Sequence, residues 1–509
     1  MTRLLRKAGR WALPLVMALA ACTVGPDFHR ATVPMPPRWD DVSKQSDPSR
    51  PVATPVDPQW WTIFGDAELS SLIQRVATSN LDVRAASTRL WQSRAEREAV
   101  GADAMPNVEG EAAYQHAHAS ANGLVDPSDR NGESAYDVWQ SDFDASWELD
   151  IWGRVRRETE SADATVEASA DARRGVLVSV LAETARDYMQ LRAVQAKSAI
   201  ARQQLDVARH SLKLSDIRFK DGVVTRLQVA QAASQVANVE ARLPPLEQQQ
   251  KRLINALSYL VAQPPRTLAD ELGLSTGVPP VPPRVPVGLP SQLAERRPDI
   301  RQAEAVLHGA TADVGVAVGD FYPRITLSGD VGLQALQLSS FGAWGSRLFA
   351  VGPAISLPVF EGGRLHGTLD LRRAQQQEAA IHFQQTVLKA WREVDDGLTG
   401  YNTTQRRLDQ LDEAVRQDQL VLAETQRQYV AGLDDLLQVL IAQQALLVSQ
   451  EAAIDSSAEV SLALVSLYKS LGGGWETAFP AIAQSTAVWP AAQTTQDVPQ
   501  TAAVDLRTK

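Results

Sequence analysis

Residues 141–151, Ser-Asp-Phe-Asp-Ala-Ser-Trp-Glu-Leu-Asp-Ile, alternate between apolar and polar side chains along their whole length. The odd positions hold Phe143, Ala145, Trp147, Leu149 and Ile151, and the even positions hold Asp142, Asp144, Ser146, Glu148 and Asp150. A period of two predicts a β-strand with one apolar face and one acidic face. Such a strand belongs either to a soluble sheet that buries its apolar face or to a membrane barrel that turns this face toward lipid.

Three further segments show the same alternation, so strands are expected at about 106–118, 139–151, 323–334 and 349–360. Each run has the length of a tilted strand that crosses a bilayer, about 9–11 residues. Aromatic residues flank the runs and would suit the interfacial girdles of a membrane barrel. These residues are Tyr136, Trp139, Trp152, Phe321, Tyr322 and Phe360.

Four strands cannot seal a membrane barrel, because such barrels begin at about eight strands and an open edge in lipid is too costly. The barrel must therefore be shared between chains. Two chains would give a barrel filled by side chains, and three would give twelve strands and a lumen. The strands alone leave both open, but a duct requires three chains. Its acidic inner face would favour cations.

The sequence contains an internal repeat. Leu81-Asp-Val-Arg-Ala-Ala86 matches Pro298-Asp-Ile-Arg-Gln-Ala303 at an offset of 217, and Phe219 to Val229 matches Tyr429 to Val439 at an offset of 210. We therefore expect a first repeat at 66–262 and a second at 291–475, joined by a Pro-rich linker at 263–290. An N-terminal arm at 22–65 precedes them, and a small, polar tail at 476–509 is expected to be disordered.

Each repeat contains a very long run without proline, at 155–219 and at 365–429. Each run would form about 95 Å of helix, far beyond the usual globular length. Each ends at a glycine, Gly222 or Gly432, where the chain reverses into a second helix at 225–262 or 434–471. A coiled-coil stalk would show the same periodicity, but a stalk needs no membrane strands.

The first 21 residues are typical of a signal peptide, with a basic start and a short apolar stretch. Leu19-Ala-Ala-Cys22 resembles a bacterial lipobox, so Cys22 would become the acylated first residue of the mature chain. Thr23, in place of aspartate, favours the outer membrane by resemblance to lipoprotein sorting. The alternative is an ordinary signal peptide followed by an unmodified cysteine.

Composition excludes several function classes. The net charge of −10 argues against a nucleic-acid partner. A single cysteine allows neither an intramolecular disulfide nor a cysteine-based metal cluster. His116 and His118 share one strand face, but a surface pair explains them as well as a metal site. With no nucleophile–base constellation, the sequence predicts a protein that is not an enzyme and uses no metal or cofactor.

Six motifs together resemble the TolC/OprM outer-membrane factors over about residues 22–475. They are Cys22-Thr-Val-Gly-Pro-Asp-Phe28, Trp60-Trp-x-x-Phe-x-Asp66, Arg297-Pro-Asp-Ile-Arg-Gln-Ala-Glu304, Phe321-Tyr-Pro323, Phe360-Glu-Gly-Gly-Arg364 and Leu471-Gly-Gly-Gly-Trp475. The resemblance implies an α+β membrane protein. In this fold a homotrimer shares a twelve-stranded outer-membrane barrel, which a twelve-helix periplasmic tunnel with an equatorial belt continues.

The resemblance also implies partners. The helix tips would contact a periplasmic adaptor protein, which links the duct to an inner-membrane transporter of the resistance-nodulation-division type. The expected contact residues are Gly222, Val223, Thr225, Gly432, Leu433, Asp434 and Asp435. The expected function is an exit duct for small toxic compounds. Type I protein secretion and a non-conducting structural lipoprotein stalk are the alternatives.

One segment departs from the family pattern. The helix after the second tip of these proteins carries inward carboxylates that close the tunnel, whereas the matching residues here are Leu437, Gln438 and Ile441. We therefore predict a gate of apolar rings from Leu437 and Ile441 with amides beside them. An apolar constriction can close by dewetting, with less sensitivity to pH and divalent cations than a ring of carboxylates.

Overall fold

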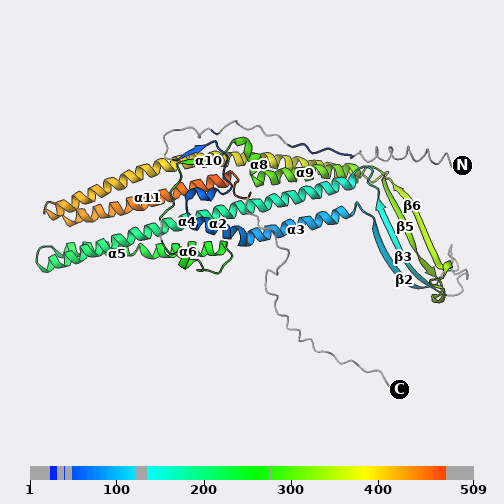
Figure 1. Ribbon diagram of the computed structural model, residues 1–509, viewed down its shortest axis with the longest axis horizontal. Coiled ribbons are helices and arrows are strands. Elements are labelled where there is room, and N and C mark those ends of the chain that lie inside the picture. The colour runs from blue at the N-terminus through cyan, green and yellow to red at the C-terminus, as the bar shows by residue number, and fades with distance from the viewer. Residues whose placement is uncertain are drawn as a thin grey trace, which may run out of the picture.

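The computed structural model describes residues 23–30, 39, 49–118, 120, 135–274 and 277–476. It is an elongated rod of helices with a sheet at one end, which turns away from the helix axis (Figure 1). The predicted signal peptide, Cys22 and almost all of the predicted tail lie outside the described residues.

Two long helices form the frame of the rod. Helix α4 spans Arg154–Lys220 and helix α10 spans Arg364–Val430, each with 67 residues. Their length follows from the absence of proline, whose missing N–H and ring would break the backbone ladder. Both helices run from the sheet to the opposite end of the molecule (Figure 1). Each is about 100 Å long at 1.5 Å per residue.

The return helices differ between the repeats. Helix α11 spans Leu436–Ser470 without a break, but the single helix expected at 225–262 was wrong. The chain forms α5 at Arg226–Glu240 and α6 at Leu243–Leu260 instead. Pro244 and Pro245 lie in the first turn of α6, where proline is tolerated because that turn needs no backbone donors. Inside one continuous helix the same prolines would remove backbone hydrogen bonds, so the preceding helix ends before them.

Shorter helices complete the half of the rod nearer the sheet. Helix α3, Leu81–Ala102, packs on α4, and helix α9, Pro298–Gly319, packs between α4 and α10. Helix α11 also packs between α4 and α10, in the other half of the rod. The start of α9 meets the end of α11 where the two halves of the rod join. At this point Arg297 donates to the carbonyl of Ser470 (2.8 Å).

The four predicted strands form one antiparallel sheet in the order β2-β3-β5-β6. Strands β2 and β3 span Asn107–Ala117 and Tyr136–Glu148, and strands β5 and β6 span Arg324–Ala335 and Arg347–Ser356. One-turn 3-10 helices at Leu338–Ser340 and Trp344–Ser346 lie between β5 and β6.

Two predicted strand ends were wrong. Strand β3 stops at Glu148, because Asp150 turns back to accept the backbone N–H groups of Val155 (3.1 Å) and Arg156 (2.9 Å) at the start of α4. Strand β6 stops at Ser356, which pairs with Arg324. Its neighbour β5 begins there, after Pro323, so residues 357–360 have no strand beside them.

The apolar core lies around the middle of the rod. It gathers α4, α10 and α11 with a surrounding belt of small elements. These are β1 (Arg50–Val52) parallel to β4 (Arg284–Pro286), helices α2 (Ala67–Ser79), α7 (Ala269–Leu272) and α8 (Leu293–Arg296), and 3-10 helices at Trp60–Phe64 and Pro290–Gln292. The segment predicted as a linker thus contributes buried side chains, including Leu272 and Val285. Trp60 stacks on Tyr468 at 5.4 Å.

Candidate functional site

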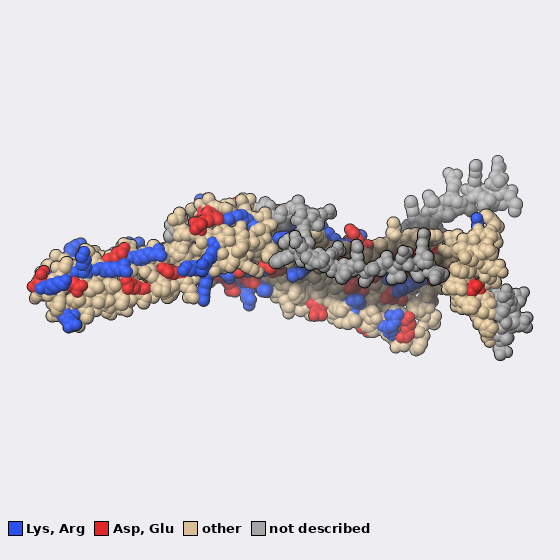
Figure 2. Space-filling model, turned by 90° about the horizontal axis from the view of Figure 1, so that it is seen from below, with Lys and Arg blue, Asp and Glu red and all other residues tan. Residues whose placement is uncertain are grey.

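The described residues form no core behind the apolar face of the sheet. Phe143, Val331 and Phe349 are in register across β3, β5 and β6. Their exposed fractions are 61 %, 59 % and 81 %. The face of the sheet end visible in Figure 2 carries few charged side chains. A soluble sheet would bury such residues, so the alternative of a soluble sheet does not fit this arrangement.

The opposite face of the sheet carries carboxylates in adjacent rows. Asp144 lies directly between Glu109 on β2 and Asp330 on β5, and Asp142 lies beside Glu111. Like charges opposite each other destabilise a sheet unless water screens them. We call these five residues the carboxylate belt. Asp142 is buried, but the other four are exposed or partly exposed. This arrangement favours a wet surface on this side of the sheet, as in a water-filled channel.

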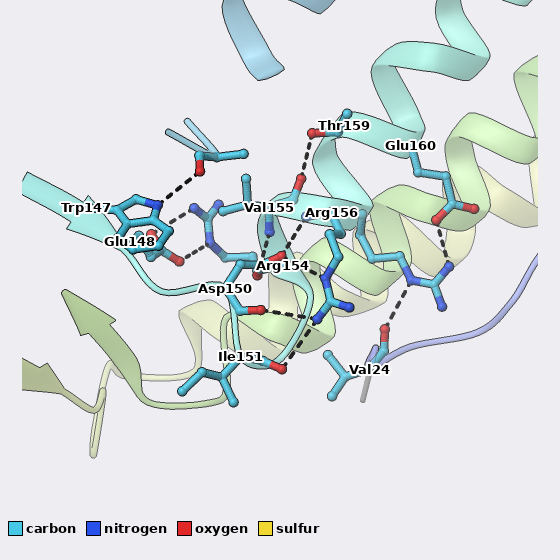
Figure 3. Close-up of polar contacts among 12 residues, drawn as sticks. Val24, Trp147, Glu148, Asp150, Ile151, Arg154, Val155, Arg156, Thr159 and Glu160 are labelled. Atoms are coloured by element: carbon cyan, nitrogen blue, oxygen red, sulfur yellow. Dashed lines mark hydrogen bonds and ion pairs between the residues drawn. The ribbon is translucent and has the colours of Figure 1, made fainter. Parts of the chain in front are cut away.

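Ion pairs fix the sheet to α4 at the strand–helix junction (Figure 3). The guanidinium of Arg154 donates twice to Glu148 at the end of β3 (3.0 Å each) and once to Glu158, one turn along α4 (3.1 Å). The indole of Trp147 donates to the carbonyl of Ala104, after α3 (3.0 Å). These contacts hold the sheet at a set angle to the helices.

The arm at residues 23–30 runs from this junction along α4 and α9. The N–H of Val24 donates to the carbonyl of Trp152 (3.0 Å), and Arg157 binds Asp27 (2.5 Å). This hydrogen bond lowers the pKa of Asp27. Arg30 grips Glu304 through two hydrogen bonds (2.8 and 3.0 Å). The predicted acylation site, Cys22, directly precedes this held segment and lies outside the described residues.

The helix tips lie at the end of the rod farthest from the sheet (Figure 1). Gly222 and Gly432 both have φ of 74°, the left-handed backbone that favours glycine at a reversal. Val223 and Leu433 are exposed there, as are Thr225 and Asp435, while Asp434 is half-buried. The predicted contact residues therefore cluster on one end of the molecule.

Two contacts that sequence reasoning missed join the two tips. Arg218 Nη1 on α4 donates to the hydroxyl of Tyr429 on α10 (2.9 Å), and Gln228 Nε2 on α5 donates to Asp435 (3.0 Å). The guanidinium of Arg218 also lies 5.3 Å from the centre of the Tyr429 ring. The repeat offered a signal, since Tyr429 takes the place of Phe219 and the added hydroxyl accepts the hydrogen bond.

The predicted gate residues share one face of α11. Leu437, Gln438 and Ile441 are exposed, and the exposed fractions of Leu437 and Ile441 are 40 % and 53 %. Val448 continues the same stripe and was missed by sequence reasoning, although its spacing of seven from Ile441 predicts it. The described part of the chain does not cover this apolar stripe.

The described residues show no cluster of three or more metal-ligating side chains. His116 instead contacts Asp137 (2.7 Å), which also accepts from Tyr114 (3.0 Å). Among the same residues, no helix combines the length and apolarity of a membrane span.

Comparison with known proteins agrees with this geometry. The outer membrane efflux protein family matches residues 72–263 and 289–473, which covers both repeats. The chain belongs to this family. The pyoverdine export outer membrane protein OpmQ of Pseudomonas aeruginosa is 32 % identical over 82 % of this chain and 88 % of its own. The toluene efflux pump protein TtgC of Pseudomonas putida is 30 % identical over 90 % and 93 %.

A solved structure of the outer-membrane channel OprN, 32 % identical, superposes with a TM-score of 0.82. It covers 89 % of this chain and all of the OprN chain. The CmeC channel of Campylobacter jejuni is 21 % identical with a TM-score of 0.81 and shows the shared fold. This efflux protein is therefore an outer-membrane channel of efflux pumps and not an enzyme. The alternative of a non-conducting stalk is excluded.

Proposed function

We propose that three copies of this efflux protein close their sheets into a twelve-stranded barrel across the outer membrane and continue it as a twelve-helix periplasmic tunnel. The observation that carries the proposal is the sheet itself. Its order, β2-β3-β5-β6, leaves β2 and β6 each with one partner within the described chain. An open edge in lipid is too costly, so each edge needs a neighbour's strand.

The cargo is a set of small toxic compounds that pass through the tunnel. The names of relatives that report efflux of toluene and antibiotics support this class, and the name of another reports export of pyoverdine. A deletion strain should be tested with a panel of solvents, antibiotics and siderophores. It should become sensitive to toxic compounds that the duct exports and should retain exported compounds that are not toxic. In parallel, the purified protein should be a trimer in detergent and conduct in planar bilayers. A stable monomer without conductance would refute the duct.

The tips are the adaptor-binding end. Val223 and Leu433 are large apolar side chains that are exposed beside the reversals of the two hairpins, which suits a partner that covers both. The partners are a periplasmic adaptor and, through it, an inner-membrane transporter of the resistance-nodulation-division type. The transporter supplies the energy, because the duct has no catalytic site of its own.

Acylation of Cys22 anchors the mature chain to the outer membrane. The contacts of residues 23–30 support this assignment, because Val24 is bonded to Trp152 at the boundary between sheet and helix. The acyl chains would thus enter the bilayer beside the barrel wall. Mass spectrometry of the mature N-terminus tests the modification, with Cys22→Ser as the unmodified control.

The exposed stripe of Leu437 and Ile441 forms the closed gate, with Gln438 beside it. Three copies would bring these side chains together where the tunnel narrows, and an apolar ring excludes water and ions. Ile441→Ser should raise the resting conductance of the trimer in planar bilayers, whereas Ile441→Val, which keeps the side chain apolar, should not. Equal conductance of the serine variant and the parent protein would overturn the apolar gate.

A further inference from the structure

A hollow of about 680 Å³ lies at the place where α11 ends and α9 begins. Both helices fill the space between α4 and α10, and neither spans it alone. The residues of the joint, Arg297 and Gly472, line the hollow together with residues of α4 and α10. Its volume is in the range of pockets that hold drug-sized molecules, about 300–1,000 Å³.

The hollow faces away from the belt of small elements. On α4 the core positions include Leu177 and Leu181, whereas Gly175 and Ser179 line the hollow. At 100° per residue, these two sets lie on opposite sides of the helix. On α10 and α11 the core residues and the lining residues also point in different directions, although Ala463 of α11 belongs to both sets. In the proposed tunnel these small elements lie on the outside, so the hollow opens to the inside, and this step depends on the proposed function.

Two glycines of α10 leave little side-chain volume beside the hollow. Gly397 and Gly400 of α10 line the hollow, and a Cβ added at Gly400 would meet nothing within 4 Å. Glycine inside a helix costs about 1 kcal/mol relative to alanine. No close contact or left-handed backbone at Gly400 requires that cost. We therefore attribute the glycine at position 400 to the space that it leaves in the hollow.

The hollow presents charges of both signs that the protein does not pair. Arg297 is neutralised, since it donates to Asp299 (2.7 Å) and Glu393 (2.8 Å). By contrast, Lys469 and Asp396 line the hollow, are exposed, and form no ion pair within the described part of the chain. Val178 and Pro298 also line the hollow and are apolar.

We propose that this hollow is a holding site inside the tunnel for zwitterionic small molecules with an apolar body. The carboxylate of the guest lies against Lys469, its ammonium group against Asp396, and its body against Val178 and the bare backbone of Gly400. Three such sites around the tunnel keep a molecule halfway between tips and barrel. A guest with one charge leaves one of the two wall charges unpaired.

Fluorescence titration of the purified full-length trimer tests the site. The probe is Nε-dansyl-lysine, a zwitterion whose dansyl group brightens on leaving water, compared with dansyl-glycine (anion) and dansyl-cadaverine (cation). Lys469→Gln and Asp396→Asn should each weaken binding of the zwitterion about fivefold, since an exposed ion pair contributes up to about 1 kcal/mol. A Cβ at Gly400 meets nothing within 4 Å, so Gly400→Leu should place its side chain in the hollow and weaken binding more than about tenfold.

Gly367→Leu is the matched control, because Gly367 lies on the same helix, also with nothing within 4 Å of an added Cβ, and does not line the hollow. It should bind the probe as the parent protein does. Equal binding of the three probes, or equal binding by Gly400→Leu and Gly367→Leu, would overturn the proposal. Conductance of each trimer is measured in parallel, with and without Ile441→Ser. A conducting trimer that fails to discriminate refutes the holding site, whereas a trimer that does not conduct even with Ile441→Ser refutes the duct.

Discussion

Removal of the Tyr429 hydroxyl should favour the open state of the tunnel end. Tyr429→Phe deletes the acceptor of the Arg218 hydrogen bond (2.9 Å) and keeps the ring, so the guanidinium–ring contact at 5.3 Å remains. Such a bond between half-buried partners contributes about 1 kcal/mol net. If the two hairpins separate when the tunnel opens, each subunit loses this amount of closed-state stability.

The assay is the open probability of single reconstituted channels. Independent subunits would shift the open–closed ratio about fivefold, and three subunits that open together would shift it by about 150-fold, the factor for about 3 kcal/mol. Arg218→Gln should shift it further, because it also removes the contact with the ring. Tyr259→Phe is the control, since Tyr259 is exposed on α6. An open probability of Tyr429→Phe within twofold of the parent value would refute the inference that this bond resists opening.

Three other changes test other parts of the molecule. Asp144→Asn with Asp330→Asn should lower the cation-to-anion permeability ratio several-fold, measured as reversal potential in a KCl gradient; an unchanged potential would show that the carboxylate belt does not face the lumen. The hydrogen bond with Glu271 and burial raise the pKa of Glu68 from 4.5 to about 7. Because this pKa is higher in the folded state, its stabilising contribution is complete below about pH 4.5 and lost as pH rises through about 7. Glu68→Gln should flatten that part of a profile of melting temperature against pH, and an unaltered profile would contradict the assignment. Arg157→Gln should release the arm and speed proteolysis at residues 23–30 in the folded trimer, with unchanged cleavage as the contrary result.

Sequence patterns predicted the elements whose physics is periodic. The alternation around Phe143 located the strands, and the lack of proline after Val155 located the first long helix, because both signals repeat over many residues. The ends of elements depended on single contacts instead. For example, Asp150 lies outside the sheet because it accepts hydrogen bonds from the first N–H groups of α4. A periodic sequence pattern does not predict such a contact.

The sequence predicted where the tip and gate residues lie, but not the side-chain contacts between the two repeats. The Gly222 and Gly432 reversals followed from glycine at the end of a long helix, and the stripe of Leu437 and Ile441 followed from helical spacing. The pairing of Arg218 with Tyr429 required the two repeats to lie side by side in space. The hollow at the end of α11 depends on how α11 and α9 meet, which is a property of the folded chain and not of a sequence pattern.

The two uninterrupted helices have a mechanical consequence. Since α4 and α10 each pass from the sheet to the tips as one stiff element, a tilt of either helix about its sheet end is amplified with distance. An angle of about 5° displaces the far end by about 9 Å, given a length of about 100 Å. In the proposed trimer the wall would therefore act as a set of levers, with its pivots at the Arg154 end and its longest travel at Gly222 and Gly432. A small push from a partner at the tips would suffice to widen the aperture while the membrane end barely moves.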